Sequence, residues 1–330
     1  MIPITDLSWQ GHSWQSLVSS AIRTGADLAG ALGLDLEALE QVETDFPVNV
    51  PLPYLARIER GNPRDPLLLQ VMTSVSELLP SGTTSPLQEE AFKLGFGLIQ
   101  KYNGRVLVIT TGSCAIHCRY CFRRHFPYAE NQPSTEDWTA LFHQIEQDQS
   151  LSEVILSGGD PLMLNDRRLA WIAENLARIP HITTLRLHTR MPVVIPQRVT
   201  STLLDWMSES SLNIVLVTHV NHGNEIDSEV RLAMKQLHQA GATLLNQSVL
   251  LKDINDNAEA LVTLSNKLMD SGVLPYYLHL MDPVLGASHF DVDETAGVAL
   301  ISALRQCLPG YLVPRLSREV PFESSKRVIA

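Results

Sequence analysis

Six short apolar runs, rich in β-branched residues, recur along the chain beyond residue 100 and constrain its fold more than any other feature. The runs lie at 106–110, 154–157, 184–188, 214–218, 243–246 and 276–281. Most of them are followed by a turn and then by apolar residues at helical spacing, as at 135–147, 167–177, 227–240 and 257–271. Strand–helix units in series form a parallel sheet with right-handed crossovers, and six units are fewer than the eight of a closed barrel. The sequence therefore predicts an α/β fold with a partial, open (βα)6 barrel.

The first 95 residues follow a different pattern, with apolar residues at three- and four-residue intervals that Pro and Gly interrupt. We expect helices in this region at 14–24, 26–32, 35–42 and 52–60. The segment 79–86, which contains two prolines and a glycine, is the best candidate for a linker. We therefore expect three parts: an N-terminal helical region (1–95), a barrel (96–290) and a short C-terminal segment (291–330).

The chain carries a net charge of −11, from 25 Lys and Arg residues against 36 Asp and Glu residues. Because a negative protein repels phosphate backbones at long range, we expect no nucleic acid partner. No apolar stretch reaches membrane-spanning length, and the first residues lack a basic region followed by an apolar run. Three of the four cysteines are clustered, which argues against a disulfide framework and fits a reducing compartment. We expect a cytoplasmic protein without a membrane partner.

The clustered cysteines are Cys114, Cys118 and Cys121. Iron–sulfur clusters are held by four ligands, so three thiolates would leave one iron open to a small molecule. A Cys3His zinc site completed by His117 or His125 is an alternative, although zinc ligands usually occur as two separated pairs. An inert group of reduced cysteines is a third interpretation, and the spacing alone leaves all three open.

Glycine and polar residues follow the predicted strands where each strand ends. The cysteines follow the first run and Asp282 closes the sixth. The segments between them are Ser157-Gly158-Gly159-Asp160, Thr189-Arg190, His219-Val220-Asn221-His222 and Asn246-Gln247-Ser248. Because the carboxyl ends of parallel strands meet at one rim of a barrel, we expect these residues to form one site.

Two of these segments, and Arg123 in the cysteine loop, also have purely structural interpretations. The pair Gly158-Gly159 either lets a ligand approach the backbone or marks a turn. His219 is either a ligand contact or a satisfied loop residue. Arg123 is well shaped to hold a substrate carboxylate by two parallel hydrogen bonds, but with Arg124 it could equally form a solvated basic patch.

Taken together, these motifs resemble the lysine 2,3-aminomutase family, a branch of radical S-adenosylmethionine (SAM) enzymes that also uses pyridoxal 5′-phosphate (PLP). The cysteine spacing is similar to the radical SAM signature, in which the three thiolates hold a [4Fe-4S] cluster and SAM occupies the open iron. The resemblance extends from about Gln88 to Lys326. Its other markers lie at 105–110, 157–162, 188–190, 192–194, 196–198, 218–222, 246–251 and 282–286.

This resemblance implies roles for residues around the two organic cofactors. Lys326 would carry PLP, although its position near the end of the sequence would not by itself select it. Arg105 and Gln247 would lie near the PLP phosphate, and Tyr102 would contact the ring. The segment Ser157-Gly158-Gly159-Asp160 is similar to the glycine-rich motif that accepts the amino group of SAM, with Asp160 where Glu is more usual. His219 would be a further contact on the SAM side.

The resemblance also implies how an amino acid substrate is held. Arg123 would bind the α-carboxylate, while Asp282 and Glu319 would surround the distal ammonium of lysine. Two acids suit an ammonium that enters a partly dry pocket. Glu319 stands where the family more often has Asp, which adds one methylene at a position that measures substrate length.

Two departures from the family pattern indicate a particular branch. The residues before Lys326 read Pro-Phe-Glu-Ser-Ser instead of a glycine-rich run, and Cys307 is the only late cysteine, so we expect no zinc site. This shortened form resembles the aminomutases that serve the β-lysylation of elongation factor P. The likeness implies conversion of L-α-lysine to (R)-β-lysine, which a separate ligase attaches to that factor, and a homo-oligomer. The alternatives are an arginine or glutamate 2,3-aminomutase, or a non-catalytic metal-binding adaptor of elongation factor P.

Overall fold

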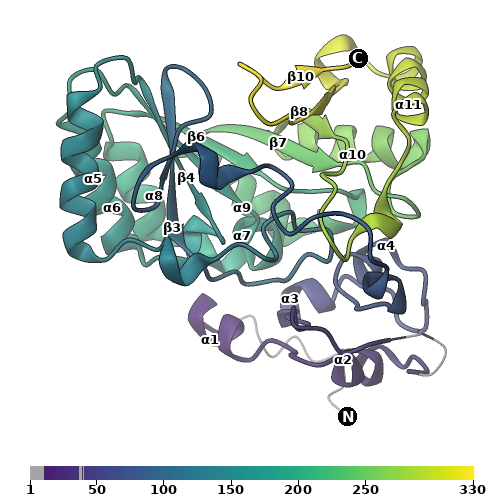
Figure 1. The fold of residues 1–330 in the computed structure, drawn as a ribbon. Coiled ribbons are helices and arrows are strands. Elements are labelled where there is room, and N and C mark those ends of the chain that lie inside the picture. The colour runs from purple at the N-terminus through teal and green to yellow at the C-terminus, as the bar shows by residue number, and fades with distance from the viewer. Residues whose placement is uncertain (1–10, 37–38, 40) are drawn as a thin grey trace.

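The structure, a computed structural model, describes residues 11–36, 39 and 41–330. These residues form a ten-stranded sheet in the order β1 to β10, with consecutive strands paired along its length (Figure 1). The strands are β1 Lys93–Gly95, β2 Leu98–Ile99, β3 Arg105–Thr111, β4 Glu153–Gly158, β5 Thr184–Thr189, β6 Asn213–Thr218, β7 Thr243–Val249, β8 Leu274–His279, β9 Arg315–Arg318 and β10 Arg327–Val328. The sheet is therefore an open one with β1 and β10 at its two ends.

Strands β3 to β8 are the six predicted strands, with each end within three residues of its expected position, and they pair in parallel. A helix follows each of them. These helices are α5 Thr135–Gln147, α6 Asp166–Ala177, α8 Ser201–Glu209, α9 Ser228–Gln239, α10 Ala258–Asp270 and α11 Glu294–Cys307. The prediction of a partial (βα)6 barrel is confirmed, and the helices α8 and α11, which the sequence analysis did not list, complete the series.

Local sequence explains where the barrel helices begin. Ser134 caps α5 through a capping box with Asp137, and Asp227 and Asn257 cap α9 and α10. Such side chains satisfy backbone N–H groups that have no partner within the helix. The apolar face that follows each cap packs on the sheet, so the helices begin where the sequence pattern predicts.

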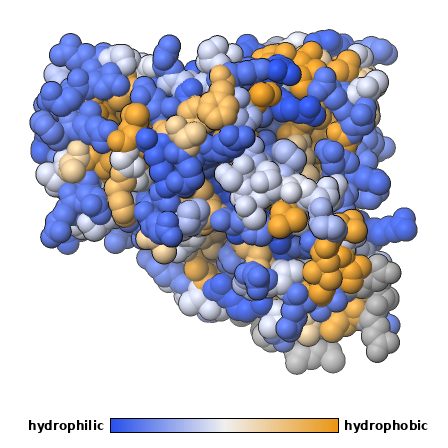
Figure 2. Space-filling view, in the orientation of Figure 1, coloured by the Kyte–Doolittle hydropathy of each residue, from blue (hydrophilic) through white to orange (hydrophobic). Residues whose placement is uncertain are grey.

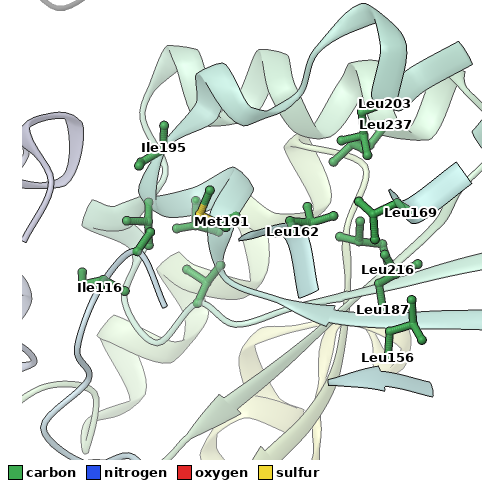
Figure 3. Close-up of a cluster of buried hydrophobic side chains, with 14 of the residues drawn as sticks. Ile116, Leu156, Leu162, Leu169, Leu187, Met191, Ile195, Leu203, Leu216 and Leu237 are labelled. Carbon is green, nitrogen blue, oxygen red and sulfur yellow. The ribbon is translucent and has the colours of Figure 1, made fainter. Parts of the chain in front are cut away.

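The main core lies between the sheet and these helices (Figure 3). Leu156, Leu187 and Leu216 come from three adjacent strands, β4, β5 and β6, and none of their surface is exposed. Leu169 of α6 and Leu203 of α8 are equally buried in the same cluster. Burying each such side chain contributes on the order of 2 kcal/mol. This packing fixes the positions of the strands and therefore of the loops at their carboxyl ends.

The N-terminal region lies against one side of the barrel (Figure 1), and its helices are shorter than expected except for α2, which confirms the helix predicted at 26–32. Its helices are α1 Trp14–Ser19, α2 Gly25–Leu32, α3 Leu52–Leu55 and α4 Pro66–Leu69. The helix predicted at 14–24 ends early because Ile22 pairs with Val50 in an extended bridge. The helix predicted at 35–42 lies partly outside the described residues. The pairing of Ile22 with Val50 thus takes the place of the last turn of the helix predicted at 14–24.

The C-terminal segment adds strands that the sequence analysis did not expect. Strand β9 pairs in parallel with β8, and β10 returns antiparallel to β9. At the other end of the sheet, β1 and β2 form an antiparallel hairpin that pairs with β3. The predicted boundary near residue 95 falls inside that hairpin, and residues 291–330 continue the same sheet. The three predicted parts therefore share one sheet.

A further feature of the molecule is the distribution of polar and apolar side chains on the surface. Figure 2 shows a largely hydrophilic face, with apolar side chains gathered over the N-terminal region at the lower right and near the C-terminal strands at the top right. Among the described helices, none has both the length and the apolar character needed to cross a membrane.

Candidate active site

A cavity of about 410 Å³ extends along the inner side of the barrel strands, from Arg105 at the start of β3 to the loops at the carboxyl ends, and is also lined by the C-terminal segment. Its volume falls in the range of roughly 300–1,000 Å³ that is usual for ligand pockets. Every residue to which the family resemblance gave a role lines it, whereas the cavity is not lined by Asn221, His222, Asn246 and Ser248, which were also expected at this rim. The residues with such a role are Tyr102, Arg105, Cys114, Cys118, Cys121, Arg123, Ser157, Gly158, Gly159, Asp160, His219, Gln247, Asp282, Glu319 and Lys326. The fold thus gathers into one place residues that are up to 224 positions apart, from Tyr102 to Lys326.

The three cysteines lie on the loop after β3, and the N-terminal region holds this loop. Nδ2 of Asn49 donates to the carbonyl of Cys114 at 3.1 Å, and the N–H of His117 donates to the carbonyl of Asn49 at 3.1 Å. Burial, with Cys118 nearby, raises the pKa of Cys121 to about 11, and burial also raises the pKa of Cys114 well above its ordinary value. These thiols would lose their protons on binding iron, as ligands of metal clusters do. Three thiols facing one cavity fit a [4Fe-4S] cluster.

The two histidines that could complete a Cys3His zinc site, His117 and His125, each contact a backbone carbonyl instead. Nδ1 of His117 lies 2.8 Å from the carbonyl of Pro47, and its ring stacks on Phe46 at 4.5 Å between centroids. Nε2 of His125 lies 3.1 Å from the carbonyl of Leu285. These contacts orient both imidazoles by backbone groups outside the cysteine loop, and they favour the cluster over a Cys3His site.

The glycine pair after β4 is explained by close backbone packing. Gly158 has a φ of +116°, and a Cβ on it would lie 2.6 Å from the carbonyl oxygen of Thr111. A Cβ on Gly159 would lie 2.3 Å from the carbonyl oxygen of Ser113. Both contacts are with the start of the cysteine loop, so larger residues would push this loop away from β4. Contact with SAM at this segment stays a prediction.

Asp160 has a positional role that the sequence analysis did not predict. Its Oδ1 accepts hydrogen bonds from the N–H of Leu162 at 3.0 Å and from the hydroxyl of Thr189 at 2.6 Å. Its Oδ2 accepts from the N–H groups of Arg190 at 2.7 Å and Met191 at 3.1 Å. The buried carboxylate therefore ties the loop after β4 to the loop after β5.

His219 lies beside the cysteine loop through Tyr120. The Tyr120 hydroxyl is 2.9 Å from Nε2 of His219, and Nδ2 of Asn221 is 3.4 Å from the same nitrogen. Burial, and then the charge of Arg190, lower the pKa of His219 to about 4. The imidazole is therefore neutral near pH 7 and suited to hydrogen bonding.

At the far end of the cavity, two ammonium groups share one carboxylate. Oε1 of Glu319 accepts from Nζ of Lys101 at 2.8 Å, and Oε2 accepts from Nζ of Lys326. Burial would raise the pKa of Glu319, but Lys326 and Lys101 hold it below its ordinary value. Burial and the neighbouring Glu319 raise the pKa of Asp282 to about 7. The predicted acid pair is thus assembled, with one member already paired.

The predicted carboxylate-binding arginine is held from one side. Glu89 accepts from Nε and Nη2 of Arg123, both at 2.8 Å, while Nη1 donates to the Ser157 hydroxyl at 3.0 Å. A guanidinium has five N–H donors. Among the contacts of the described residues, one N–H on each terminal nitrogen has no partner and remains for a substrate carboxylate. Glu89 therefore positions Arg123 without using all of its donors.

The predicted PLP residues lie beside buried cationic groups. The guanidinium of Arg105 stacks over the ring of Tyr102 at 5.3 Å, and Gln247 lies 3.4 Å from His279. Within the described part of the chain, Nε of Arg105 and Nε of Arg186 are buried without hydrogen-bond partners. Unpaired donors of this kind carry a free-energy cost that an anionic ligand would remove. The arrangement fits a phosphate group.

Several lining residues were missed by the sequence analysis. Arg186 and His188 were detectable, because they alternate with buried leucines along β5 and so share one face of the strand. Glu89 and Lys101 carried no local signal, since they precede the first barrel strand. Both join the site only because the β1–β2 hairpin folds against β3.

Comparisons with known proteins extend these observations. Residues 108–264 match the model of the Radical SAM superfamily. The chain is 45% identical to the L-lysine 2,3-aminomutase of Escherichia coli (strain K12) over 321 residues, which are 96% of this chain and 94% of that protein. It is 43% identical to the L-lysine 2,3-aminomutase of Haemophilus influenzae over 335 residues, covering 100% of this chain and 99% of that one. A solved radical SAM methyltransferase from Sphaerobacter thermophilus is similar with a TM-score of 0.46 and 15% identity, over 67% of this chain and 68% of that one.

Proposed function

Because the chain belongs to the L-lysine 2,3-aminomutase family of radical SAM enzymes, which are isomerases that use a [4Fe-4S] cluster and SAM, we propose that it converts L-α-lysine to (R)-β-lysine with PLP. The observation that carries this proposal is the placement of Arg123 and the Asp282–Glu319 pair around the same cavity. One end offers donors for a carboxylate, and the other offers acids for an ammonium. Membership in an isomerase family sets aside the alternative of a non-catalytic adaptor.

Lys326 is the residue that we propose to carry PLP. It lines the cavity and is fixed by its ion pair with Glu319. Arg105 and Arg186 supply the donors for the phosphate, and Tyr102 and Gln247 lie beside them as the resemblance implies. Arg186 is an addition to the residues expected from sequence.

The substrate is held at both ends by groups of the chain. The remaining N–H donors of Arg123 bind the α-carboxylate, and Glu89 fixes the position of the guanidinium. Asp282 binds the distal ammonium in its ionised form, so its protonation controls the affinity for a cationic side chain. The acid is half-ionised near pH 7, which makes it sensitive to its neighbours.

When bound, the reduced cluster supplies an electron for the homolytic cleavage of SAM, and PLP holds the amino group that migrates between adjacent carbons. The chain itself contributes position. Cys114, Cys118 and Cys121 hold iron, His219 offers a neutral imidazole on the same side, and the buried walls limit water at the reacting carbons. Fixed distance between the two cofactors is the main effect that the fold provides.

A glutamate substrate is disfavoured because Asp282 and Glu319 would repel its side chain. Arginine keeps the positive charge and so satisfies the same two acids. The size of the cavity at this end, and the extra methylene of Glu319, then decide between lysine and arginine.

We also propose the wider setting on the family resemblance. The β-lysine would pass to a separate ligase that modifies elongation factor P, in the cytoplasm, and the enzyme would act as a homo-oligomer. The net charge of −11 supports a small-molecule substrate over a nucleic acid.

The decisive experiment is an anaerobic assay of the reconstituted protein with SAM, PLP and a strong reductant. Lysine, arginine and glutamate are supplied separately, and products are resolved by chiral chromatography. We expect (R)-β-lysine from lysine, at a kcat/KM well above that for the other two. Preferential turnover of arginine or glutamate would overturn the substrate assignment.

A further inference from the structure

Arg190, which directly follows β5, reaches into the cysteine loop. Its Nη1 lies 2.7 Å from the sulfur of Cys118, and its side chain is 6% exposed. The guanidinium also lies over the rings of Tyr54 and Tyr120, at 5.5 and 5.9 Å from their centroids. A buried, permanently charged donor is therefore in contact with one of the three sulfur ligands.

The other terminal nitrogen of Arg190 has two short hydrogen bonds, and the Tyr54 hydroxyl lies at 3.5 Å as a third, longer contact. Nη2 donates to Oε1 of Gln70 at 2.6 Å and to Oε2 of Glu225 at 2.7 Å. Gln70 belongs to the N-terminal region, directly after α4, whereas Glu225 lies after β6. The guanidinium thus bridges two distant parts of the chain and the cysteine loop.

Both acceptors are themselves fixed. The amide of Gln70 donates to Oε1 of Glu225 at 3.3 Å. The same oxygen accepts from the N–H groups of Asn221 at 2.8 Å and His222 at 2.9 Å. Because each partner has several bonds, the guanidinium has little freedom to turn away from the sulfur.

We propose that Arg190 is a positioning residue that donates to the sulfur of Cys118 and thereby raises the reduction potential of the cluster, with Gln70 and Glu225 aiming it. Reduction adds negative charge to the cluster, so a donor at a ligand sulfur stabilises the reduced form more than the oxidised form. Outer groups that hydrogen-bond to ligands tune metal sites in this way.

The charge of Glu225 does not cancel this effect. The ion pair with Glu225 is on Nη2, while Nη1 faces the sulfur, so the positive end of the pair points at the cluster. A one-electron donor of low potential would then reduce the cluster more readily. This inference rests on the cluster alone and stands whether or not lysine proves to be the substrate.

The competing role for Arg190 is to bind a carboxylate, such as that of SAM, since a guanidinium beside a cavity is suited to it. The two roles differ when SAM is absent. A donor to the sulfur shifts the potential of the cluster by itself, whereas a carboxylate anchor changes only the affinity for SAM.

The test is a potentiometric titration, followed by electron paramagnetic resonance, of the reconstituted full chain without SAM. Arg190→Met, Arg190→Lys and Gln70→Leu are compared with the wild type, with iron and sulfide measured for each. Arg198→Met is the matched control, because Arg198 is also fully buried and contacts the N-terminal region over Trp14 at 4.8 Å.

We expect Arg190→Met to make the midpoint potential more negative, with a change on the order of tenfold in the equilibrium of reduction, or about 59 mV for one electron. Gln70→Leu and Arg190→Lys should shift it less and in the same direction, and Arg198→Met should leave it unchanged. Full cluster content with an unaltered potential in Arg190→Met would overturn the proposal, and weaker SAM binding in that variant would then assign Arg190 to the carboxylate. If Arg190→Met holds no cluster, unaltered potentials in both Gln70→Leu and Arg190→Lys would overturn it.

Discussion

The two ends of the cavity hold their charges in different ways. At the cysteine end, the side chains of Arg190 and Glu225 are 6% and 0% exposed, and each is fixed by several hydrogen bonds. At the far end, Glu319, Lys101 and Lys326 are more exposed, at 15%, 14% and 23%. The far-end groups contact one another, and Lys101 also contacts Glu89 at 3.1 Å. The cysteine end is therefore locked by the scaffold, while the far end consists of ion pairs that a charged substrate can exchange.

The largest effect is expected from removing a sulfur ligand at the cysteine end of the cavity. Cys118→Ser removes one of three sulfur ligands, so the cluster should be lost and SAM cleavage should fall to background. Iron and sulfide content, and 5′-deoxyadenosine formed under strong reductant, measure this. Cys307→Ser is the control, because Cys307 is exposed and lies outside the cysteine loop. Undiminished deoxyadenosine in Cys118→Ser would reject the ligand assignment.

At the exchangeable end, the strongest change is Lys326→Ala. Without this amine, PLP has no lysine to bind, so the absorption band of lysine-bound PLP should disappear while cluster content stays normal. Lys252→Ala, at an exposed position, should keep the band. A band retained in Lys326→Ala would move the PLP lysine elsewhere.

Asp282→Asn tests the charge that meets the substrate. Loss of one charged hydrogen bond should weaken binding of the transition state by about 1.5–3 kcal/mol. The kcat/KM for lysine should therefore fall roughly 10- to 150-fold. In the wild type, kcat/KM should rise with pH through about 7, because Asp282 must ionise to bind the ammonium. The variant should lack this rise. Equal pH profiles for the two proteins would rule out the role of Asp282.

A subtler change at the same end is Lys101→Met. The positive charge of Lys101 lowers the pKa of Asp282 against the larger effect of burial. Its removal should raise that pKa, so the rise of kcat/KM should move to higher pH by a fraction of a unit. Lys93→Met, which breaks the ion pair between Lys93 of β1 and Glu90, is the control. A shift of this rise to lower pH would contradict the conclusion that Lys101 lowers the pKa of Asp282.

The smallest effect is expected far from both ends. Ser134→Ala removes the N-cap of α5 and should lower the free energy of unfolding by about 1 kcal/mol. The kcat/KM should not change, because α5 packs on the outside of the sheet. Denaturant unfolding monitored by circular dichroism measures the first, and the standard assay the second. A reduced kcat/KM would mean that the outer helices also set the geometry of the cavity.

Much of the barrel was predictable because its signals are local. Apolar runs of strand length and capped helical patterns recur in order, and parallel strands place their carboxyl ends at one rim. The C-terminal strands β9 and β10 were missed because they are short and rich in polar residues, as in the run Arg315–Arg318. The early end of α1 was missed because it depends on the pairing of Ile22 with Val50, which is a contact between distant residues.

The sequence by itself determined the chemistry that the chain carries: three cysteines in one loop, a late lysine, and acids and an arginine at strand ends. Spacing along the chain is enough for the cysteines and the strand-end residues, because they lie within one loop or at repeating points of a regular fold, whereas Lys326 and Glu319 were selected only by the resemblance to the family. Only the tertiary structure decided how the charges pair. Glu89 against Arg123, Lys101 against Glu319, and Arg190 against Cys118 are contacts between segments far apart in sequence, and burial forces each charge to find a partner wherever the fold places one.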